Sequence, residues 1–188
     1  MNLAENPSVG PAVYDRAAIA DAVERLAAEV ARDYRGKPLL LLGVLKGALC
    51  FTTDLARALA GRPDGPSEIL VDYLCLERYG ASGTSGGRVR LAMDAAEPIA
   101  GANVLLLDDV ADNGHTLAFA LALLGERKPA SLRTCVLFDK PARREVEVRL
   151  DYAGLPVPDV FVIGYGLDYK ELYRNLPYLA ELREGITV

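Results

Sequence analysis

LLLDDVADNGHT, residues 105–116, carries the strongest structural signal in this sequence. Its apolar run, Val104–Leu107, is typical of a strand that is buried on both faces. The acidic, glycine-containing stretch Asp108–Thr116 is expected to form a turn, and a helix is expected over Thr116–Leu124. A strand that leads through a turn into a helix is the repeating unit of an α/β fold.

The same alternation extends outward from this segment in both directions. Helices are expected from an N-cap at Asp15 to about Arg32 and from about Gly47 to Ala60, and strands over Leu39–Val44, Glu68–Leu76, Val89–Met93, Arg133–Phe138 and Val160–Tyr165. Glycine and hydroxyl residues predict a flexible loop at Tyr79–Gly87 (YGASGTSGG). We therefore predict an α/β fold with a parallel twisted sheet and helices on both faces, and expect residues 1–188 to form one domain.

Composition argues against several classes of protein. The formal net charge of −5, without a basic stripe, argues against nucleic-acid binding. No apolar run is long enough to span a membrane, and the N-terminal MNLAENPSVGP lacks the pattern of a secretory signal, so a cytoplasmic protein is expected. The single histidine cannot supply a multi-histidine metal site, and the three cysteines, which lie in apolar stretches without a CxxC pair, are interpreted as core residues.

Polar residues follow three of the predicted strands. Lys46 comes after Leu39–Val44, Asp108 begins the acidic turn, and Asp168 follows the last predicted strand. Ligands of open α/β sheets bind beyond the carboxyl ends of the strands. We therefore expect these three groups to converge on one site.

The acidic turn has the composition of a binding site for a phosphorylated ribose. Successive amides of Asp112–Thr116 can point at one phosphate, assisted by the partial positive charge of the following helix, and Gly114 permits the turn that this needs. Asp108 and Asp109 can accept hydrogen bonds from sugar hydroxyls or from the water shell of a Mg²⁺ ion. The alternative interpretation is a solvated acidic turn in which Asp112 only caps the helix.

Three stretches together resemble a known family. LLLDDVADNGHTL (residues 105–117) resembles the phosphoribosyl-pyrophosphate (PRPP) signature of the type I phosphoribosyltransferases. LLLGVLKGALCFTTDLARAL (residues 40–59) is similar to the first strand, pyrophosphate loop and next helix of the hypoxanthine–guanine branch, and residues 139–182 resemble its purine-binding and C-terminal segment. The resemblance implies a core over about residues 15–140 and a small C-terminal hood formed by the N-terminal lead and about residues 150–188.

For function, the resemblance implies a Mg²⁺-dependent enzyme of purine salvage. Such an enzyme transfers ribose 5-phosphate from PRPP to hypoxanthine or guanine, giving IMP or GMP and pyrophosphate. The implied PRPP contacts are Asp112, Asn113, Gly114, His115 and Thr116 for the 5′-phosphate, Asp108 and Asp109 for the ribose and the outer metal shell, and Lys46, Gly47 and Arg174 for the pyrophosphate. A cis peptide bond between Leu45 and Lys46 and a homodimer or homotetramer are also implied, and the apolar helix Gly47–Ala60 is a candidate interface.

The same resemblance implies the contacts of the 6-oxopurine base. Asp112 would face purine N7 as the general base, a role that suits a carboxylate within hydrogen-bond reach of a leaving proton. Lys140 would read O6, Phe161 would stack on the ring and the backbone of Val162 would meet its edge. Asp168 would ligate a second Mg²⁺ ion and help to read the 2-position of the base.

Taken without the resemblance, several of these residues have ordinary alternatives. Lys46 could be a surface lysine, Arg174 could form a surface ion pair with Glu171, Lys140 could lie in a simple turn, and Phe161 could be a core aromatic.

Three positions depart from the family pattern. Arg78 stands where a serine usually precedes Tyr79 at the start of the mobile loop, Asn113 replaces a threonine or serine, and Asp108 stands where many relatives have glutamate. These differences leave two alternatives to the main interpretation. One is a related phosphoribosyltransferase with a shifted base preference, such as xanthine, and the other is a catalytically weakened nucleotide-binding regulator.

Overall fold

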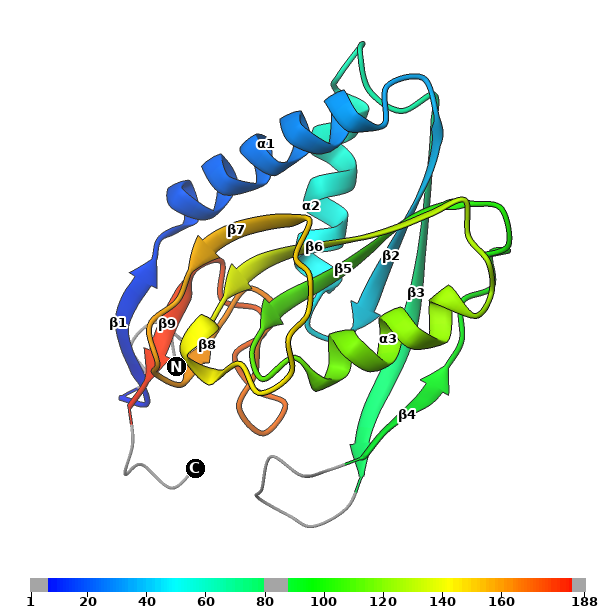
Figure 1. Cartoon of the computed structure of the whole chain (residues 1–188). Coiled ribbons are helices and arrows are strands. Elements are labelled where there is room, and N and C mark those ends of the chain that lie inside the picture. Colours follow the sequence, from blue (N-terminus) through cyan, green and yellow to red (C-terminus); the bar gives the residue numbers. More distant parts are fainter. Residues whose placement is uncertain (1–6, 80–87, 184–188) are drawn as a thin grey trace.

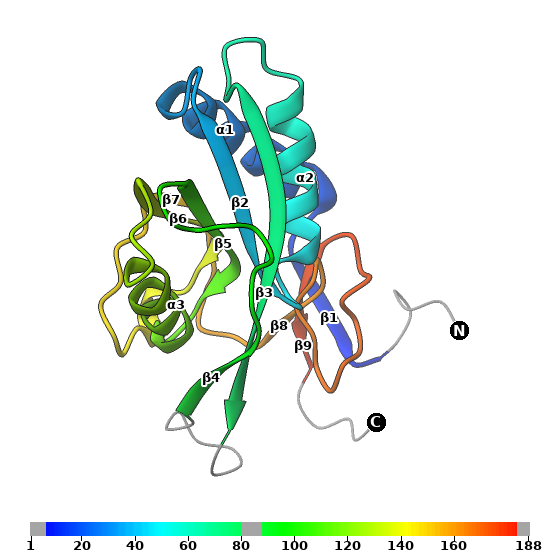
Figure 2. The ribbon, with the colours of Figure 1, turned by 90° about the vertical axis from the view of Figure 1, so that its right-hand side faces the viewer.

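The structure is a computed structural model that describes residues 7–79 and 88–183. Its elements are β1 (Val9–Tyr14), α1 (Arg16–Asp33), β2 (Pro38–Leu45), α2 (Leu49–Ala60), β3 (Glu68–Tyr79), β4 (Arg88–Met93), β5 (Asn103–Ala111), α3 (His115–Gly125), β6 (Ser131–Asp139), a short 3₁₀ helix (Pro141–Arg143), β7 (Tyr152–Pro156), β8 (Val162–Ile163) and β9 (Leu179–Leu182). A six-stranded sheet in the order β4-β3-β2-β5-β6-β7 carries α1 and α2 on one face and α3 on the other (Figures 1 and 2). Only the β3–β4 pair is antiparallel among the described strands of this sheet. The predicted α/β fold with helices on both faces is confirmed.

Helix α1 forms where its cap and its apolar spacing predict it. The Asp15 side chain accepts a hydrogen bond from the amide of Ala18 at 2.8 Å, which satisfies one of the free amides of the first turn. Ile19, Val23 and Leu26 are buried on the inner face of the helix. The helix ends at Asp33, one residue beyond the prediction.

The two central strands form the core of the domain. Leu39–Leu42 of β2 and Val104–Leu107 of β5 are each at most 2% exposed. Alternate side chains contact α1 and α2 on one face and α3 on the other, so both faces are covered. Since full burial of one such side chain stabilises a fold by about 1.5–3 kcal/mol, these two strands make a large contribution to the stability of the sheet.

Strand β5 is longer than predicted. Asp108 and Asp109 belong to the strand and not to a turn, because β6 continues to pair alongside them: Asp108 pairs with Val136 and Ala111 with Asp139. The turn is therefore confined to Asp112–Gly114. The carboxylates are held by a rigid ladder, which fixes their direction more firmly than a turn would.

The predicted strand Val160–Tyr165 is wrong in length and in place. Only Val162–Ile163 is extended, and it pairs antiparallel with β9 in a separate small sheet of order β1-β9-β8. The chain cannot continue as a strand because Gly164, Tyr165 and Gly166 all have positive φ angles, of 101°, 48° and 103°.

Three strands were missed from the sequence. β1 and β9 belong to the small sheet, which joins the N-terminal lead to the C-terminal segment, and β7 is a parallel strand at the edge of the main sheet. β7 contains Gly154 and ends at Pro156, two residue types that are rare in strands. The main sheet thus extends beyond the core boundary expected near residue 140.

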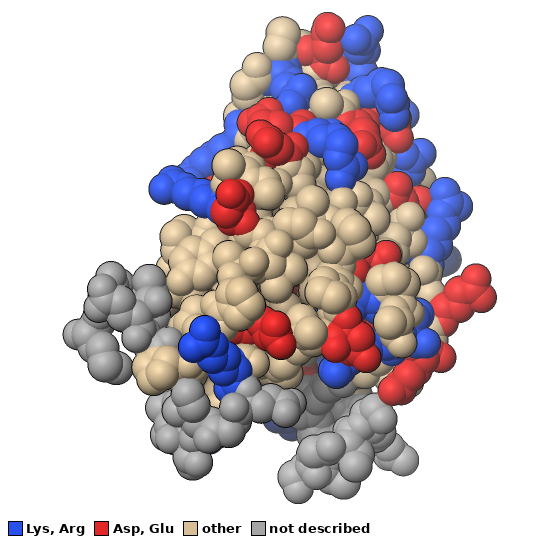
Figure 3. Space-filling view, turned by 90° about the vertical axis from the view of Figure 1, so that its left-hand side faces the viewer, with Lys and Arg blue, Asp and Glu red and all other residues tan. Residues whose placement is uncertain are grey.

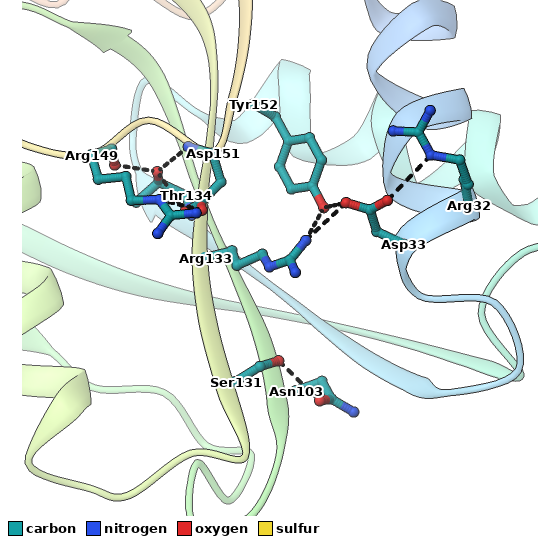
Figure 4. Close-up of polar contacts among 9 residues, drawn as sticks. All are labelled: Arg32, Asp33, Asn103, Ser131, Arg133, Thr134, Arg149, Asp151 and Tyr152. Carbon is teal, nitrogen blue, oxygen red and sulfur yellow. Dashed lines mark hydrogen bonds and ion pairs between the residues drawn. The ribbon is translucent and has the colours of Figure 1, made fainter.

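A polar cluster closes the amino ends of β6 and β7 (Figure 4). The Asp33 carboxylate accepts hydrogen bonds from Arg133 and from the Tyr152 hydroxyl, both at 2.8 Å. Next to it, the Asp151 carboxylate accepts the amide of Thr134 at 3.0 Å. We call these five residues the amino-end cluster; it fastens α1 and β7 to the start of β6.

The surface of the described chain is mixed in charge. On the face shown in Figure 3, basic side chains alternate with acidic ones around a broad area without charged side chains, and they form no continuous stripe there. Within residues 7–79 and 88–183, no helix has both the length and the apolar character needed to cross a membrane.

Candidate active site

Two of the three polar groups that were predicted to converge, Asp108 and Asp168, lie at the carboxyl ends of β2, β5 and β6. Two adjoining cavities of about 280 and 220 Å³ open there. Asp109, Val110 and Asp112 line both cavities, so the end of β5 forms the wall that they share. This is the place where open α/β sheets bind their ligands.

Asp112–Thr116, which we call the phosphate loop, lies along the larger cavity. Gly114 caps α3 with φ of 91° in the left-handed region, which favours glycine. The amide oxygen of Asn113 accepts the amide of His115 at 3.3 Å, and the His115 ring lies 2.9 Å from the Glu145 carboxylate. Both the ring and the backbone amide of His115 are therefore engaged within the protein, the ring by Glu145 and the amide by Asn113.

The carboxylates at the end of β5 differ in their surroundings. Asp108 is 7% exposed, and its carboxylate accepts the amide of Asp109 at 3.1 Å. Asp109 in turn accepts the amide of Val110 at 2.7 Å, and loss of water contact raises its pKa. One carboxylate oxygen of Asp112 is buried without a hydrogen-bond partner among the described residues. Because a buried oxygen of this kind is costly to leave unpaired, Asp112 is a candidate for contact with a bound ligand.

The smaller cavity carries the residues predicted for the base. Lys140 is 4% exposed, donates to the Val160 carbonyl at 2.7 Å, and has a pKa lowered by burial. Phe161 is 45% exposed and meets the Tyr169 ring edge-on, with ring centroids 5.7 Å apart. Val162 lines the same wall. Phe161 is thus a cavity residue and not the core aromatic of the alternative interpretation.

The residues predicted for pyrophosphate lie on two loops: Gly47 lines the 280 Å³ cavity, and Arg174 lines a separate cavity of about 740 Å³. The Leu45–Lys46 peptide bond is cis, as the resemblance implies. The Lys46 ammonium group lies 3.0 Å from the Glu171 carboxylate. The Arg174 guanidinium group pairs with Asp168 at 2.8 Å and with Glu171 at 3.2 Å. The surface ion pair of Arg174 with Glu171 therefore exists, together with a second pair to a predicted site residue.

Gly47 permits the close approach of this loop to β5. A Cβ atom at position 47 would overlap the Asp109 carboxylate, and a Cβ atom at Gly166 would overlap the Gly47 carbonyl. The pyrophosphate loop, the end of β5 and the C-terminal segment meet at one point because two glycines face each other there.

Two predicted residues lie partly outside the described chain. Arg78 and Tyr79 end β3, where their backbones pair with Val89 and Arg88. Their side chains and residues 80–87, which hold most of the predicted loop, are outside the described residues.

The carboxylates around the two cavities are of the kind that binds Mg²⁺. In the described part of the chain, no three His, Cys, Asp or Glu side chains are grouped closely enough to bind a metal alone. Mg²⁺ commonly takes only one or two carboxylates and completes its shell with water and substrate phosphates. Asp108, Asp109 and Asp168 supply that type of donor around the two cavities.

Two arginines and a leucine are among the residues near these cavities that the sequence did not predict. Arg143 and Leu167 line the smaller cavity, and Arg144 binds the back of the phosphate loop. All three lie within residues 139–182, which resemble the family, and the pair Arg143-Arg144 is a local signal for two of them.

A strand-end phosphate loop, paired carboxylates and a lysine-bearing pocket define a class of protein, the phosphoribosyltransferases. Residues 11–170 match the family model described as "Phosphoribosyl transferase domain". The finer assignment follows from individual relatives.

The relatives of this chain are hypoxanthine or hypoxanthine-guanine phosphoribosyltransferases. It is 39% identical to the hypoxanthine-guanine phosphoribosyltransferase of Dictyostelium discoideum over 92% of this chain and 94% of that protein. A crystal structure of a hypoxanthine phosphoribosyltransferase from Staphylococcus aureus superposes with a TM-score of 0.88 at 35% identity, covering 97% and 96% of the two chains. A ternary substrates complex of the Trypanosoma cruzi enzyme gives a TM-score of 0.85 at 35% identity, covering 94% and 97%. The chain belongs to the hypoxanthine-guanine phosphoribosyltransferase family.

Proposed function

We propose that this enzyme transfers ribose 5-phosphate from PRPP to hypoxanthine or guanine, giving IMP or GMP and pyrophosphate in purine salvage. The observation that carries the proposal is the position of Asp112. Its unpartnered, buried carboxylate oxygen belongs to a residue that lines both the phosphate-loop cavity and the cavity of Lys140 and Phe161. A residue that contacts both the sugar phosphate and the base has to lie between the two cavities that bind them.

PRPP is held from three sides in this proposal. The amides of the phosphate loop and the partial positive charge of α3 bind the 5′-phosphate. Asp108 and Asp109 accept hydrogen bonds from the ribose hydroxyls. Lys46, Arg174 and the backbone of Gly47 bind the pyrophosphate and stabilise its charge as it leaves. Glu171 must release Lys46 and Arg174 for this to happen, and exposed ion pairs of this kind are weak enough to exchange.

The base is bound in the smaller cavity. The Lys140 ammonium donates to O6 of a 6-oxopurine and would meet the amino group of adenine as a second donor, which disfavours adenine. Phe161 stacks on the ring, and the backbone of Val162 meets its edge. Asp112 accepts the proton that leaves N7 as the new glycosidic bond forms. Transfer then proceeds without a free charge accumulating on the base.

Magnesium would supply neutralisation of the pyrophosphate charge, with Asp168 as a direct ligand and Asp108 and Asp109 in its outer shell. Asp168 now accepts the amide of Glu171 at 2.8 Å and pairs with Arg174. Its partners lie on its own short segment, so the carboxylate can turn toward a cation without disturbing the sheet.

The enzyme is further proposed to be a cytoplasmic homodimer or homotetramer. Its three cysteines are free thiols, which suits a reducing compartment. Leu49 at the start of α2 is 50% exposed and lies beside a cavity of about 740 Å³ between α1 and α2, which suits the predicted interface. A monomer by light scattering at micromolar concentration would contradict the assembly and leave the chemistry intact.

The test is pyrophosphate release from PRPP and Mg²⁺ with hypoxanthine, guanine, xanthine and adenine in parallel. Turnover with hypoxanthine or guanine and none with adenine is expected. Turnover with xanthine alone would keep the chemistry and move the base preference. Release with none of the four bases, together with measurable PRPP binding, would favour the nucleotide-binding regulator.

A further inference from the structure

The segment Lys140–Val146 runs along the back of the phosphate loop. The Lys140 amide donates to the Ala111 carbonyl, and the amides of Glu145 and Val146 both donate to the Asn113 carbonyl, each at 3.0 Å. A Cβ atom at Gly114 would overlap the Val146 carbonyl, so this contact leaves no room for a side chain there. The loop therefore rests on a second piece of chain that follows β6.

Arg144 makes the central contact of this support. Its Nε donates to the Asp112 carbonyl at 2.8 Å, and one terminal nitrogen donates to the Ala111 carbonyl at 3.0 Å. The same nitrogen lies 2.6 Å from the Asp139 carboxylate, which ends β6. Only 17% of the Arg144 side chain is exposed, so these contacts are largely shielded from water.

These contacts fix the direction of the loop amides. The C=O and N–H groups of a trans peptide point to opposite sides. When segment 140–146 holds the carbonyls of Ala111, Asp112 and Asn113, the N–H groups of the following residues turn away from that segment, toward the cavity that the loop lines. A phosphate site built of backbone amides depends on this orientation.

We propose that Arg144 is a positioning residue that holds the phosphate loop and the Asp112 carboxylate in their ligand-binding orientation; the inference rests on the proposed function. It touches neither the sugar phosphate nor the base. It acts by fixing the peptide that carries Asp112, so its loss affects PRPP binding more than binding of the base.

The chemistry of arginine suits this role. The three acceptors are the carbonyls of Ala111 and Asp112 and the Asp139 carboxylate. To bind all three, a side chain needs several donors in fixed directions, which a planar guanidinium group provides and an ammonium group does not. The adjacent Arg143 is different: among the described residues its side chain pairs with Asp159, is 45% exposed, and donates no hydrogen bond to the phosphate loop.

The experiment compares Arg144→Met, Arg144→Lys, Arg144→Ala and Arg149→Met with the parent enzyme. Arg149 is the matched control, because its side chain is 84% exposed and pairs only with Asp151 among the described residues. For Arg144→Met we expect a rise of about 10-fold or more in the KM for PRPP and the Kd for ribose 5-phosphate, with the KM for hypoxanthine within about twofold. Arg144→Lys should lie between parent and Met variant, and methylguanidine should restore part of the PRPP affinity of Arg144→Ala.

Several outcomes would overturn the proposal. One is a folded Arg144→Met enzyme whose PRPP affinity stays within about twofold of the parent. Another is an equal loss of affinity for both substrates that neither lysine nor methylguanidine relieves, since that pattern belongs to general destabilisation. If Arg144→Met does not fold, Arg144→Lys decides by the same criterion.

The positioning role of Arg144 can be tested even if the proposed function fails. If the parent shows no turnover with any base, ribose 5-phosphate binding by calorimetry still reports on the loop. Weaker binding in Arg144→Met would then support the positioning role, and equal binding in parent and variant would contradict it.

Discussion

The two ends of the central sheet both carry acidic and basic side chains, yet they differ in how those groups are satisfied. In the amino-end cluster, Asp33 is shared by Arg133 and Tyr152, and Asp151 by the amide and hydroxyl of Thr134. At the carboxyl end, an Asp112 oxygen is buried without a partner among the described residues. The first arrangement stabilises the fold by itself, whereas we propose that a ligand completes the second.

The two ends of the sheet also differ in how their polar groups are supported. The amino-end cluster joins side chains of α1, β6 and β7 directly to one another. In the active site, the partners of the phosphate loop bind its back, through Arg144 and the amides of Glu145 and Val146. A binding site needs support from behind so that its front remains available. Substitutions at the two ends should therefore separate activity from stability.

The largest effect is expected from Asp112→Asn. The amide keeps the size of the side chain but cannot take the proton from N7, so transfer should slow by about 10²–10⁴-fold while PRPP still binds. Single-turnover rates and PRPP binding by calorimetry measure the two effects. Unchanged turnover would remove Asp112 from the role of general base and with it the contrast between the two ends.

A smaller effect, confined to one substrate, is expected from Gly47→Ala. The new methyl group would overlap the Asp109 carboxylate and displace either that side chain or the pyrophosphate loop. We expect kcat/KM for PRPP to fall about 10-fold or more, with a much smaller change for the base. Gly125→Ala is the matched control, because a Cβ atom there meets no atom within 4 Å. Equal PRPP kinetics in both variants would show that the close contact at position 47 is dispensable.

The amino-end cluster should respond in the opposite way. Tyr152→Phe removes the hydroxyl that binds Asp33 and Arg133. A cost of about 1 kcal/mol in unfolding free energy is expected, which corresponds to a fall of about 2–4 °C in Tm. Base and PRPP kinetics should stay within about twofold. A tenfold loss of activity at unchanged Tm would abolish the distinction between the two ends.

The smallest effect is the pH dependence of that stability difference. The hydrogen bond from Tyr152 holds the pKa of Asp33 below its usual value, assisted by Arg32 and Arg133. A lowered folded-state pKa stabilises the fold at pH values above the unfolded pKa of about 3.9, and this contribution is lost as the pH falls through the folded pKa. The stability gap between parent and Tyr152→Phe should therefore be full above about pH 4 and should shrink below it. Denaturant unfolding across this range measures the gap, and a gap that widens on acidification would contradict the assignment.

Much of the fold could be predicted because its signals are local. The continuous apolar runs of β2 and β5 predicted strands covered on both faces, and the Asp15 cap with its helical spacing predicted α1. The short strands β1, β7 and β9 were missed because each is defined by its partner strand and not by its own pattern.

The candidate site was predictable in its residue types and less so in its arrangement. Resemblance to the family supplied most of the polar residues of both cavities, and the structure brings Asp112, Lys140 and Asp168 around the smaller one. The missed residue Arg144 lies 32 positions from Asp112 in the sequence, and no local pattern connects them.

The sequence by itself therefore determined the α/β class, the buried central strands and the chemical groups that follow them, because hydrophobic periodicity and strand-end residues act over a few positions. Tertiary structure alone decided that Asp108 and Asp109 lie on a strand, that Glu171 holds Lys46 and Arg174, and that Arg144 supports the phosphate loop. These features depend on contacts between distant segments, which form only when packing of the whole core brings the segments together.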